Sequence, residues 1–301
     1  MMFCFKYLFL MQIATFLLIL YVKPISAQDS LRVLIITAHP DEAEEYAGGT
    51  IALFSKSGAA VKVASLSNGD VGHWRMTKED LAVRRKNEAL AAGKILGISS
   101  YEILDNHDGE LMPDIALRKE VVRIIREWQP DVVITFLEMF AGGHADNMAV
   151  AQTVRQGAGL SLAPLFLPEV PVLTKKPVFL VMRDYYSKSF PHKPDFVIPI
   201  DKVIELKYKS FAAHASQFFE FAPWQRGLLE EVPKEEKEQR AYFEKYWGEF
   251  STISAEMRNW LAEWYGQALA EQFTYAEEFE YASNSRHLNR EEIIKLFPML
   301  K

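Results

Sequence analysis

An alternation of short apolar runs with longer amphipathic segments is the feature that most constrains how this chain folds. Residues 33–37 (VLIIT) form a continuous apolar and β-branched run, which is typical of a strand buried on both faces of a parallel sheet. Further strands are expected at 60–66, 101–104, 132–136, 178–182 and 196–200, and helices at 48–56, 78–96, 115–128, after Asp146 and at 202–219. The alternation predicts an α/β fold with a Rossmann-like, mostly parallel sheet and helices on both faces.

The N-terminal segment departs from this alternation. Residues 1–22 are almost wholly apolar, with Lys6 as the only charge, and Ser26 and Ala27 precede the polar Gln28. This order is typical of a secretory signal peptide cleaved after Ala27, and it predicts a secreted or periplasmic protein without stable membrane insertion. The apolar run is also long enough for an uncleaved membrane anchor, and the sequence leaves that alternative open.

The C-terminal segment also departs from the alternation. Residues 234–247 and 254–273 have the pattern of amphipathic helices, and their aromatic stripe indicates packing against the rest of the protein. The predicted organisation is therefore a signal peptide at 1–27, an α/β domain at 28–220 and an aromatic-rich helical extension at 221–301, packed on the same domain.

Composition excludes several classes of function. The net charge of −6 over 301 residues argues against a protein that binds nucleic acid by neutralising phosphates. The single cysteine, Cys4, lies in the predicted signal peptide and excludes a cysteine-based zinc site and an intrachain disulfide. The first strand is not followed by G-x-G-x-x-G, and G-x-x-x-x-G-K-[ST] is absent from the sequence, which disfavours a nucleotide-binding protein.

Residues suited to hydrolytic chemistry follow the first strand directly. Pro40 biases His39 towards an extended conformation that points it out of the strand. His39 and Glu42 are three positions apart, so a turn can bring both side chains to one side and leave Asp41 free to face a water molecule. Nitrogen and oxygen ligands with a separate base are typical of a hydrolytic zinc site. The alternative is that the acidic residues cap the next helix and His39 is incidental.

A second histidine-bearing loop follows the fourth predicted strand. Gly142–Gly143 allow close approach of the backbone, and His144, Asp146 and Asn147 lead into a helix. Asp146 or Asn147 as a plain helix N-cap is the alternative interpretation. Because the carboxyl ends of parallel strands meet at one edge of a sheet, we expect the two loops to form one site there.

The sequence resembles a known family in these motifs. The segment A-H-P-D-E…A-G-G-T, followed at a distance by H-x-D, resembles the PIG-L/LmbE-like family of zinc-dependent N-deacetylases. Members of this family remove acetyl groups from N-acetylglucosamine-type sugars and glycoconjugates. Further matches occur in the family's order at S-N-G-D (67–70), R-K-N-E-A (85–89), D-G-E-L (108–111) and A-H-A-S-Q (213–217), with a weaker one at Y-A-E-E-F (275–279). The resemblance implies a deacetylase domain at 28–220.

The resemblance implies a metal site and a general base in the first loop. His39 would be one zinc ligand, and Glu42 would be the second, where the family usually has aspartate. Asp41 would be the catalytic base that takes a proton from the zinc-bound water. Glutamate offers the same carboxylate donor on a longer arm, so the exchange is chemically acceptable.

The resemblance also implies roles outside the metal ligands. His144 would stabilise the tetrahedral oxyanion or protonate the leaving amine, and Asp146 would orient His144. Arg85 would bind the substrate, either at the sugar or at an anionic group attached to it.

One position departs from the family's pattern. The second motif of the family is H-x-D-H and its last histidine is the third zinc ligand, but this chain has Asn147 there. An amide oxygen is a neutral and weaker zinc donor than imidazole, so the cofactor is expected to be Zn²⁺, another divalent and harder metal, or no metal if the site is degenerate. His73 or His107, on loops after the second and third strands, could supply the ligand instead, whereas His214 is expected to be structural or to line the pocket.

Two functions remain compatible with the sequence. The first is metal-dependent hydrolysis of the N-acetyl amide of a small-molecule or oligosaccharide substrate with release of acetate. The second is a catalytically impaired family member that binds carbohydrate. Retention of Asp41 and His144 favours the enzyme, because a binding protein needs no base, whereas Asn147 favours the binding protein. The sequence predicts no nucleic-acid partner and does not predict the oligomeric state.

Overall fold

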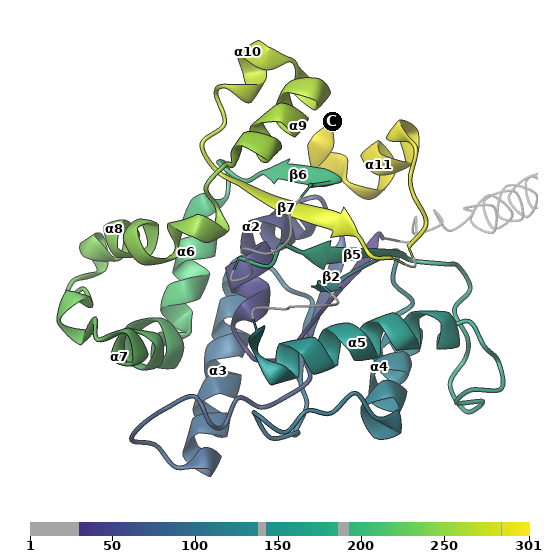
Figure 1. Ribbon diagram of the computed structural model, residues 1–301, viewed down its shortest axis with the longest axis horizontal. Helices are drawn as coiled ribbons and strands as arrows, with labels where there is room; N and C mark the ends of the chain where they lie inside the picture. The colour runs from purple at the N-terminus through teal and green to yellow at the C-terminus, as the bar shows by residue number, and fades with distance from the viewer. Residues whose placement is uncertain (1–29, 138–142, 186–192, 284) are drawn as a thin grey trace, which may run out of the picture. The chain divides into compact units, whose positions relative to one another are not determined.

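A mixed sheet of seven strands is the centre of the described structure (Figure 1). The computed structural model describes residues 30–137, 143–185, 193–283 and 285–301; the predicted signal peptide and Gly142 lie outside them. The strands are β1 Arg32–Thr37, β2 Ala60–Ser65, β3 Ser100–Ile103, β4 Val132–Phe136, β5 Val178–Met182, β6 Phe196–Pro199 and β7 Ala276–Tyr281. Their order is β3-β2-β1-β4-β5-β7-β6, with β1 to β5 parallel and β7 antiparallel to both β5 and β6.

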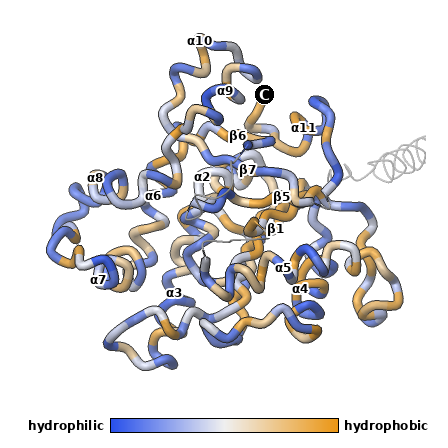
Figure 2. Tube along the Cα trace, viewed as in Figure 1, coloured by the Kyte–Doolittle hydropathy of each residue, from blue (hydrophilic) through white to orange (hydrophobic). Residues whose placement is uncertain are grey.

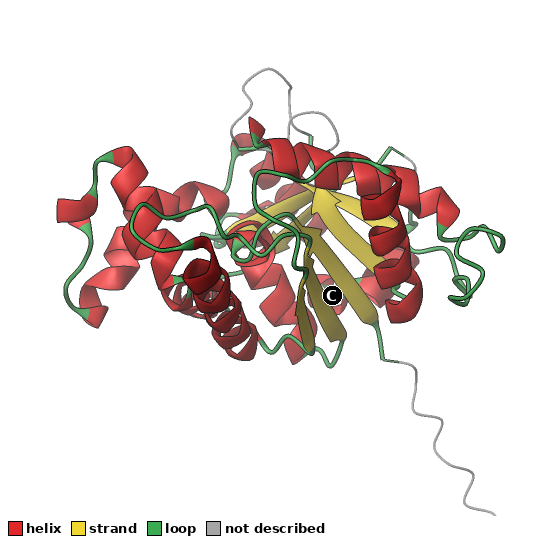
Figure 3. Cartoon of the chain, turned by 90° about the horizontal axis from the view of Figure 1, so that it is seen from below, coloured by secondary structure: helices red, strands yellow, loops and turns green. Residues whose placement is uncertain are grey.

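Helices cover both faces of this sheet (Figure 3). Helices α2, α3 and α6 contact one another, and α4 and α5 form a separate pair. The helices are α2 Glu42–Lys56, α3 Lys78–Leu96, α4 Ile115–Trp128, α5 Ala145–Leu160, α6 Ile204–Ala213, α7 Ala222–Arg226, α8 Glu236–Trp247, α9 Ala255–Tyr265, α10 Gln267–Ala270 and α11 Arg290–Leu296. Short 3₁₀ turns lie at Leu229–Glu231, Gly248–Phe250 and Pro298–Leu300, and a π-helix, η2, spans Ser216–Phe221.

The central strands have the burial that their composition predicted. Residues Val33 to Ile36 of β1 are fully buried, as is most of β4 and β5, and Figure 2 shows β1 and β5 as hydrophobic segments. Apolar side chains on both faces of a strand require a covering layer on each side, which the two groups of helices supply. The predicted Rossmann-like fold with a mostly parallel sheet is confirmed.

Helix α2 begins earlier than predicted. It starts at Glu42, whereas the sequence predicted a start at Gly48–Gly49. The two glycines serve a close approach instead, because a Cβ atom at Gly49 would lie 2.6 Å from Cγ2 of Ile200. The backbone N–H of Gly49 donates to the Glu277 carboxylate at 2.9 Å, so an acceptor from β7 lies beside the middle of the helix.

Residues 221–301 are helical, as predicted, but they also contribute a strand that was not predicted. Strand β7 lies between β5 and β6, with Glu280 opposite Val181 and Glu278 opposite Val197. The sequence of β7, AEEFEY, is too acidic to read as a buried strand. The C-terminal segment therefore shares the sheet, and residues 31–301 form one compact unit.

Two helices predicted as single segments are divided. The pattern at 202–219 becomes α6 followed by η2, and the pattern at 254–273 becomes α9 and α10. Gly266 separates the latter pair with a φ of 85°, in the left-handed region that favours glycine.

The aromatic residues of α8 pack inward as expected, with Phe243 and Trp247 buried. Within the described residues, no helix has both the length and the apolar character needed to cross a bilayer.

Candidate active site

The loops after β1, β2 and β3 meet at the carboxyl edge of the sheet, where parallel α/β sheets place their sites. Ser67 in the loop after β2 donates from its hydroxyl to the Ala38 carbonyl at 2.8 Å. Asn68 donates from its backbone N–H to the Asn106 carbonyl, in the loop after β3, at 2.9 Å. These bonds fix the relative positions of the loops that carry the candidate residues.

His39 lies at the centre of a cluster of carboxylates. Its ring is only 7% exposed. Nδ1 is 3.1 Å from Oε1 of Glu42, and Nε2 is 3.0 Å from Oδ1 of Asp108 and 3.3 Å from Oδ2 of Asp146. Burial acts to lower the pKa of His39, but the charge of Glu42 and the hydrogen bonds to the carboxylates raise this pKa well above its ordinary value. The cluster is therefore a place that favours positive charge.

Glu42 closes the turn after β1. Its Oε2 accepts hydrogen bonds from the backbone N–H groups of Ala38, at 3.0 Å, and His39, at 2.7 Å. Burial acts to raise the pKa of Glu42, but the charge and hydrogen bonds of His39 lower it. The carboxylate is thus ionised and keeps Oε1 directed at the imidazole, as the three-residue spacing predicted.

His144 and Asp146 reach the same cluster from the start of α5. The His144 ring lies edge-on to the His39 ring, with centroids 4.6 Å apart, and its Nδ1 accepts from the backbone N–H of Asp146 at 3.3 Å. The Asp146 carboxylate is instead directed to the loop after β3, where it accepts from the N–H groups of Gly109, at 2.7 Å, and Leu111, at 3.1 Å. Asp146 therefore contacts His144 through its backbone and anchors the D-G-E-L loop through its side chain.

Asp41 has an unusual backbone and a charged partner. Its φ of 134° is rare for a residue with a side chain. Its Oδ1 accepts from Nη2 of Arg85 at 2.9 Å. Burial raises the pKa of Asp41 to about 6, although the Arg85 guanidinium acts to lower it. A carboxylate with a pKa near neutrality can both accept and return a proton.

Arg85 makes its contacts with the protein. It is 3% exposed, and besides Asp41 it donates to the carbonyl oxygens of Pro40, at 2.8 Å, and Gly69, at 2.9 Å. The guanidinium thus holds the turn that presents Asp41. A contact between Arg85 and the substrate stays a prediction.

Asp108 is a member of the cluster for which the sequence predicted no role. Its carboxylate is buried against His39. Burial acts to raise the pKa of Asp108, but the hydrogen bond and charge of His39 lower it to about 2. The available signal was the D-G-E-L motif after the third strand, which places a carboxylate at the same sheet edge as the other loops.

The residues present fit a divalent cation. His39, His144 and Asp146 offer ligand atoms that all lie within 4.8 Å of one another. Asn147 is 5% exposed, its side chain bonds to Glu42, and its Oδ1 has no hydrogen-bond partner among the described residues. A buried amide oxygen needs a hydrogen-bond donor or a cation, so Oδ1 of Asn147 is available to a metal ion. The predicted ligands were His39, Glu42 and Asn147. The group formed by His39, His144 and Asp146 shares only His39 with them.

The histidines considered as alternative ligands lie outside this group. Nε2 of His73 is 2.9 Å from Oε2 of Glu220, and Nδ1 of His107 is 2.6 Å from Oδ2 of Asp70. His214, expected to be structural or to line the pocket, is fully buried.

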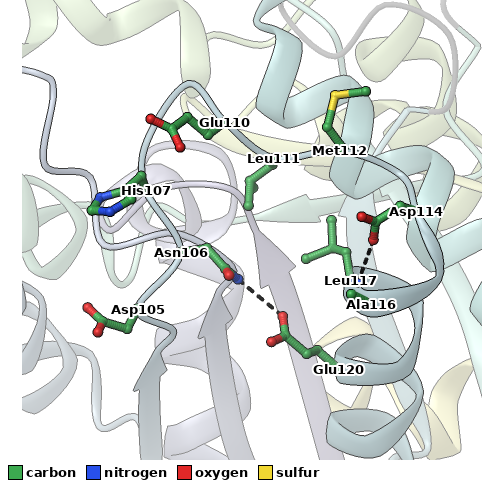
Figure 4. Close-up of a pocket in the computed structure, with 10 residues that line it drawn as sticks. All are labelled: Asp105, Asn106, His107, Glu110, Leu111, Met112, Asp114, Ala116, Leu117 and Glu120. Carbon is green, nitrogen blue, oxygen red and sulfur yellow. Dashed lines mark hydrogen bonds between the residues drawn. The ribbon is translucent and has the colours of Figure 1, made fainter.

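A cavity of about 310 Å³ lies beside the loop after β3 (Figure 4). One wall is the loop that also carries Asp108, and the other is the start of α4. Asn106 donates across it to Oε2 of Glu120 at 3.1 Å. The lining residues are Asp105, Asn106, His107, Glu110, Leu111, Met112, Asp114, Ala116, Leu117 and Glu120. The loop therefore separates the His39 cluster from an acidic cavity.

Comparison with protein families gives a match over the region that carries this site. Residues 34–158 match the family model named PIG-L, described as GlcNAc-PI de-N-acetylase. The match includes His39, Asp41 and Glu42 in the first loop and His144 to Asn147 in the second.

Known proteins and structures are similar over a larger part of the chain. A diacetylchitobiose deacetylase from Thermococcus kodakarensis is 29% identical over 63% of this chain and 71% of its own length. A 4-oxalmesaconate hydratase from Pseudomonas putida is 28% identical over 61% of this chain and 73% of its own length. The structure of the N,N'-diacetylchitobiose deacetylase from Pyrococcus horikoshii superposes with a TM-score of 0.64 at 22% identity, covering 88% of each chain, which shows that the fold is shared.

Proposed function

We propose that this chain, which carries a PIG-L family domain at residues 34–158, hydrolyses the N-acetyl amide of an N-acetylglucosamine-type sugar or glycoconjugate and releases acetate. The observation that carries the proposal is the convergence of His39, Asp146 and His144 on one point at the sheet edge, with Asp41 on the turn beside them. Similarity to a diacetylchitobiose deacetylase supports the choice of an N-acetylated sugar as the substrate.

The cofactor that we propose is Zn²⁺ or another divalent metal. We propose His39, Glu42 and Asn147 as its ligands, the set that the resemblance implies; the unpartnered Oδ1 of Asn147 and the position of Glu42 beside His39 support them. The group whose ligand atoms lie within 4.8 Å of one another is His39, His144 and Asp146, so Asp146 is the proposed alternative carboxylate ligand. When bound, a divalent cation polarises a carbonyl oxygen and lowers the pKa of water towards 7. The unpartnered Oδ1 of Asn147 is the feature of this chain that supports its role as a neutral oxygen ligand.

Asp41 and His144 would carry out the two proton transfers of the hydrolysis. Water adds to the amide carbon, and Asp41 takes the proton that the water releases. The C–N bond breaks, acetate leaves, and the nitrogen gains a proton to become the free amine. His144 is exposed at the N-terminus of α5, where it can donate a hydrogen bond to the oxyanion or the proton to the nitrogen. The partial positive charge of that helix end also favours the developing anion.

A carbohydrate-binding protein without catalysis is the second candidate. The observation that favours it is Asn147, because an amide oxygen is a weaker metal ligand than the imidazole expected from the family. The hydratase is nearly as similar to this chain as the deacetylase is. Release of acetate from an N-acetylated sugar is the measurement that identifies a deacetylase, because neither a hydratase nor a binding protein produces acetate.

The test is metal analysis of the purified protein followed by acetate assays. N-acetylglucosamine and N,N'-diacetylchitobiose are incubated with protein loaded with Zn²⁺, Co²⁺ or Mn²⁺. We expect acetate release that is abolished by a chelator and by Asp41→Asn. If neither the wild type nor Asn147→His releases acetate with any metal, while N,N'-diacetylchitobiose still binds, the binding function replaces the enzymatic one.

We also propose that the protein is secreted or periplasmic. The apolar segment at 1–22 and the small residues Ser26 and Ala27 support this location. N-terminal sequencing of the protein produced in its cell should find Gln28 as the first residue, whereas a mature N-terminus that retains residues 1–22 would indicate an anchor.

A further inference from the structure

Trp74, on the loop between β2 and α3, and Trp224, on α7, stack on each other. The rings of Trp74 and Trp224 are nearly parallel, with centroids 5.2 Å apart and an angle of 3° between their planes. His73 stacks on Trp74 at 4.5 Å, and Phe221 lies beside Trp224 at 6.0 Å. Trp224 is 44% exposed. We call His73, Trp74, Phe221 and Trp224 the aromatic platform; Trp224 is its exposed ring, whereas Trp74 and Phe221 are half-buried and the side chain of His73 is only 4% exposed. An exposed tryptophan beside a candidate active site is a candidate contact for a ligand.

Hydrogen bonds that involve η2 and α3 hold the aromatic platform in place. Nε2 of His73 is 2.9 Å from Oε2 of Glu220, which lies on η2. Arg84 donates to both oxygens of Glu220, at 2.9 and 2.5 Å, and Gln217 donates to the Gly72 carbonyl at 3.1 Å. A surface whose supports are already in place pays little ordering entropy when a ligand binds.

The platform adjoins the residues that hold Asp41. A Cβ atom placed on Gly72 would lie 3.3 Å from Nη1 of Arg85 and 3.4 Å from Cδ1 of Phe221. Gly72 therefore lies between the guanidinium that binds Asp41 and one end of the platform. Because Trp74 follows Gly72 by two positions, the same short loop supports both the candidate base and the stacked rings.

The rims of these rings carry polar groups. The indole N–H groups of Trp74 and Trp224 have no hydrogen-bond acceptor in the part of the chain that the structure describes. The Arg75 guanidinium lies 5.4 Å from the centre of the Trp74 ring. An apolar face with donors at its edge complements a pyranose ring, which has an apolar C–H face and hydroxyl groups around it.

We propose that the aromatic platform is a subsite for a second sugar ring, so that the substrate is an oligosaccharide containing N-acetylhexosamine rather than the monosaccharide. The inference rests on the proposed deacetylase function, because it assigns the acetylated ring to the His39 edge and the adjoining ring to Trp224. The ligand proposed for the exposed Trp224 ring is a sugar and not a protein partner.

Binding is measured separately from catalysis. In an Asp41→Asn background, N-acetylglucosamine and N,N'-diacetylchitobiose are titrated by calorimetry and by tryptophan fluorescence. We expect the disaccharide to bind more tightly than the monosaccharide. Trp224→Ala should weaken disaccharide binding about five- to tenfold, the effect of losing one aromatic contact, and should leave the monosaccharide unchanged.

A matched control uses the other stacked tryptophan pair. Trp260 and Trp264 on α9 stack at 5.1 Å with an angle of 9°, so Trp260→Ala removes a similar ring elsewhere on the protein. This variant should bind both sugars as the parent does. Thermal unfolding of each variant shows whether it remains folded, and Trp224→Tyr should retain most of the disaccharide affinity.

The outcomes separate this inference from the proposed function. Trp224-dependent disaccharide binding without acetate release from any loaded protein supports the subsite and removes the enzymatic proposal. Acetate release with equal kcat/KM for both sugars, unchanged in Trp224→Ala, keeps the enzyme and overturns the subsite. Equal binding of both sugars, no binding of the disaccharide, or equal losses in Trp224→Ala and Trp260→Ala also overturn it.

Discussion

At the scale of single residues, Asp41 and Arg85 determine how the sheet edge can handle a proton. The positive φ of Asp41 is a strained conformation of a kind that costs about 1–3 kcal/mol, and it must be held by its surroundings. Arg85 supplies that support through Asp41 itself and the Pro40 carbonyl. Gly69 leaves room for the guanidinium, since a Cβ atom there would lie 2.4 Å from Nη1 of Arg85.

Arg85→Lys tests whether Arg85 positions the base. Lysine keeps the charge but loses the fork that reaches Asp41 and the backbone together. We expect kcat for acetate release to fall about 100-fold, as for a small misplacement of a catalytic group, with KM little changed. A large rise in KM at constant kcat would instead assign Arg85 to substrate binding, as the sequence predicted.

Asn147→His tests the neutral oxygen ligand. Imidazole binds zinc more strongly than an amide, so we expect zinc affinity to rise about 10- to 100-fold, the range typical of changes around metal ligands. Asn147→Ala should weaken binding of every divalent metal. Competition with a chromophoric chelator measures these affinities without an activity assay, and unchanged affinity in Asn147→Ala would exclude Asn147 as a ligand.

At the scale of elements, strand β7 joins α2 and α6 through one buried ion pair. Nζ of Lys207 donates to Oε1 of Glu277 at 2.7 Å, and both side chains are completely buried. The Glu277 carboxylate also accepts from the backbone N–H groups of Gly49 and Thr50 in α2. Burial lowers the pKa of Lys207, while Glu277 acts to raise it. The C-terminal strand is thus tied to the first helix of the domain.

Glu277→Gln tests this connection. It leaves the Lys207 ammonium buried without its counter-charge, so we expect a loss of about 3–5 kcal/mol in the free energy of unfolding, measured with a chemical denaturant. Glu277→Gln combined with Lys207→Met removes the stranded charge and should recover most of the loss. A double variant as unstable as the single one would show that the acceptor for the α2 backbone, and not the ion pair, is what matters.

At the scale of the whole molecule, Glu220 on η2 connects the loop that carries His73 and Trp74 to α3. The hydrogen bond from Arg84 lowers the pKa of Glu220; burial acts to raise this pKa, and the hydrogen bond from His73 also lowers it. A group whose pKa is lower in the folded state stabilises the fold above its unfolded pKa of about 4.3, and that contribution disappears as the pH falls through the folded value.

Glu220→Gln should therefore change how stability depends on pH. We expect the wild type to be more stable than the variant at pH 7 and the difference to shrink below about pH 4.3. Denaturant unfolding of both proteins between pH 3 and pH 7 measures this. A difference that is independent of pH would contradict a role for the ionised carboxylate.

Local patterns in the sequence were enough for the parallel part of the sheet and the position of the site. The runs that became β1, β2, β4 and β5 are buried along nearly all of their length, so composition marks them, whereas the short β3 is only half-buried. His39 follows β1 closely and His144 ends the loop after β4, so parallel topology alone predicts that the two loops meet. Arg85 could be recognised as part of a motif, but its direction depends on the Gly69 and Pro40 carbonyls, which lie far from it in the chain.

The sequence by itself determined a Rossmann-like sheet and one edge that carries histidines and carboxylates, because strand burial and strand-end placement are local properties. Only the tertiary structure decided that an acidic segment such as β7 enters the sheet, because Lys207, which neutralises Glu277 there, is distant in sequence. It also decided that Asp108 joins His39 and that Trp74 stacks on Trp224, since each of these pairs comes from separate elements. Such contacts depend on how the elements pack, which no local pattern of residues records.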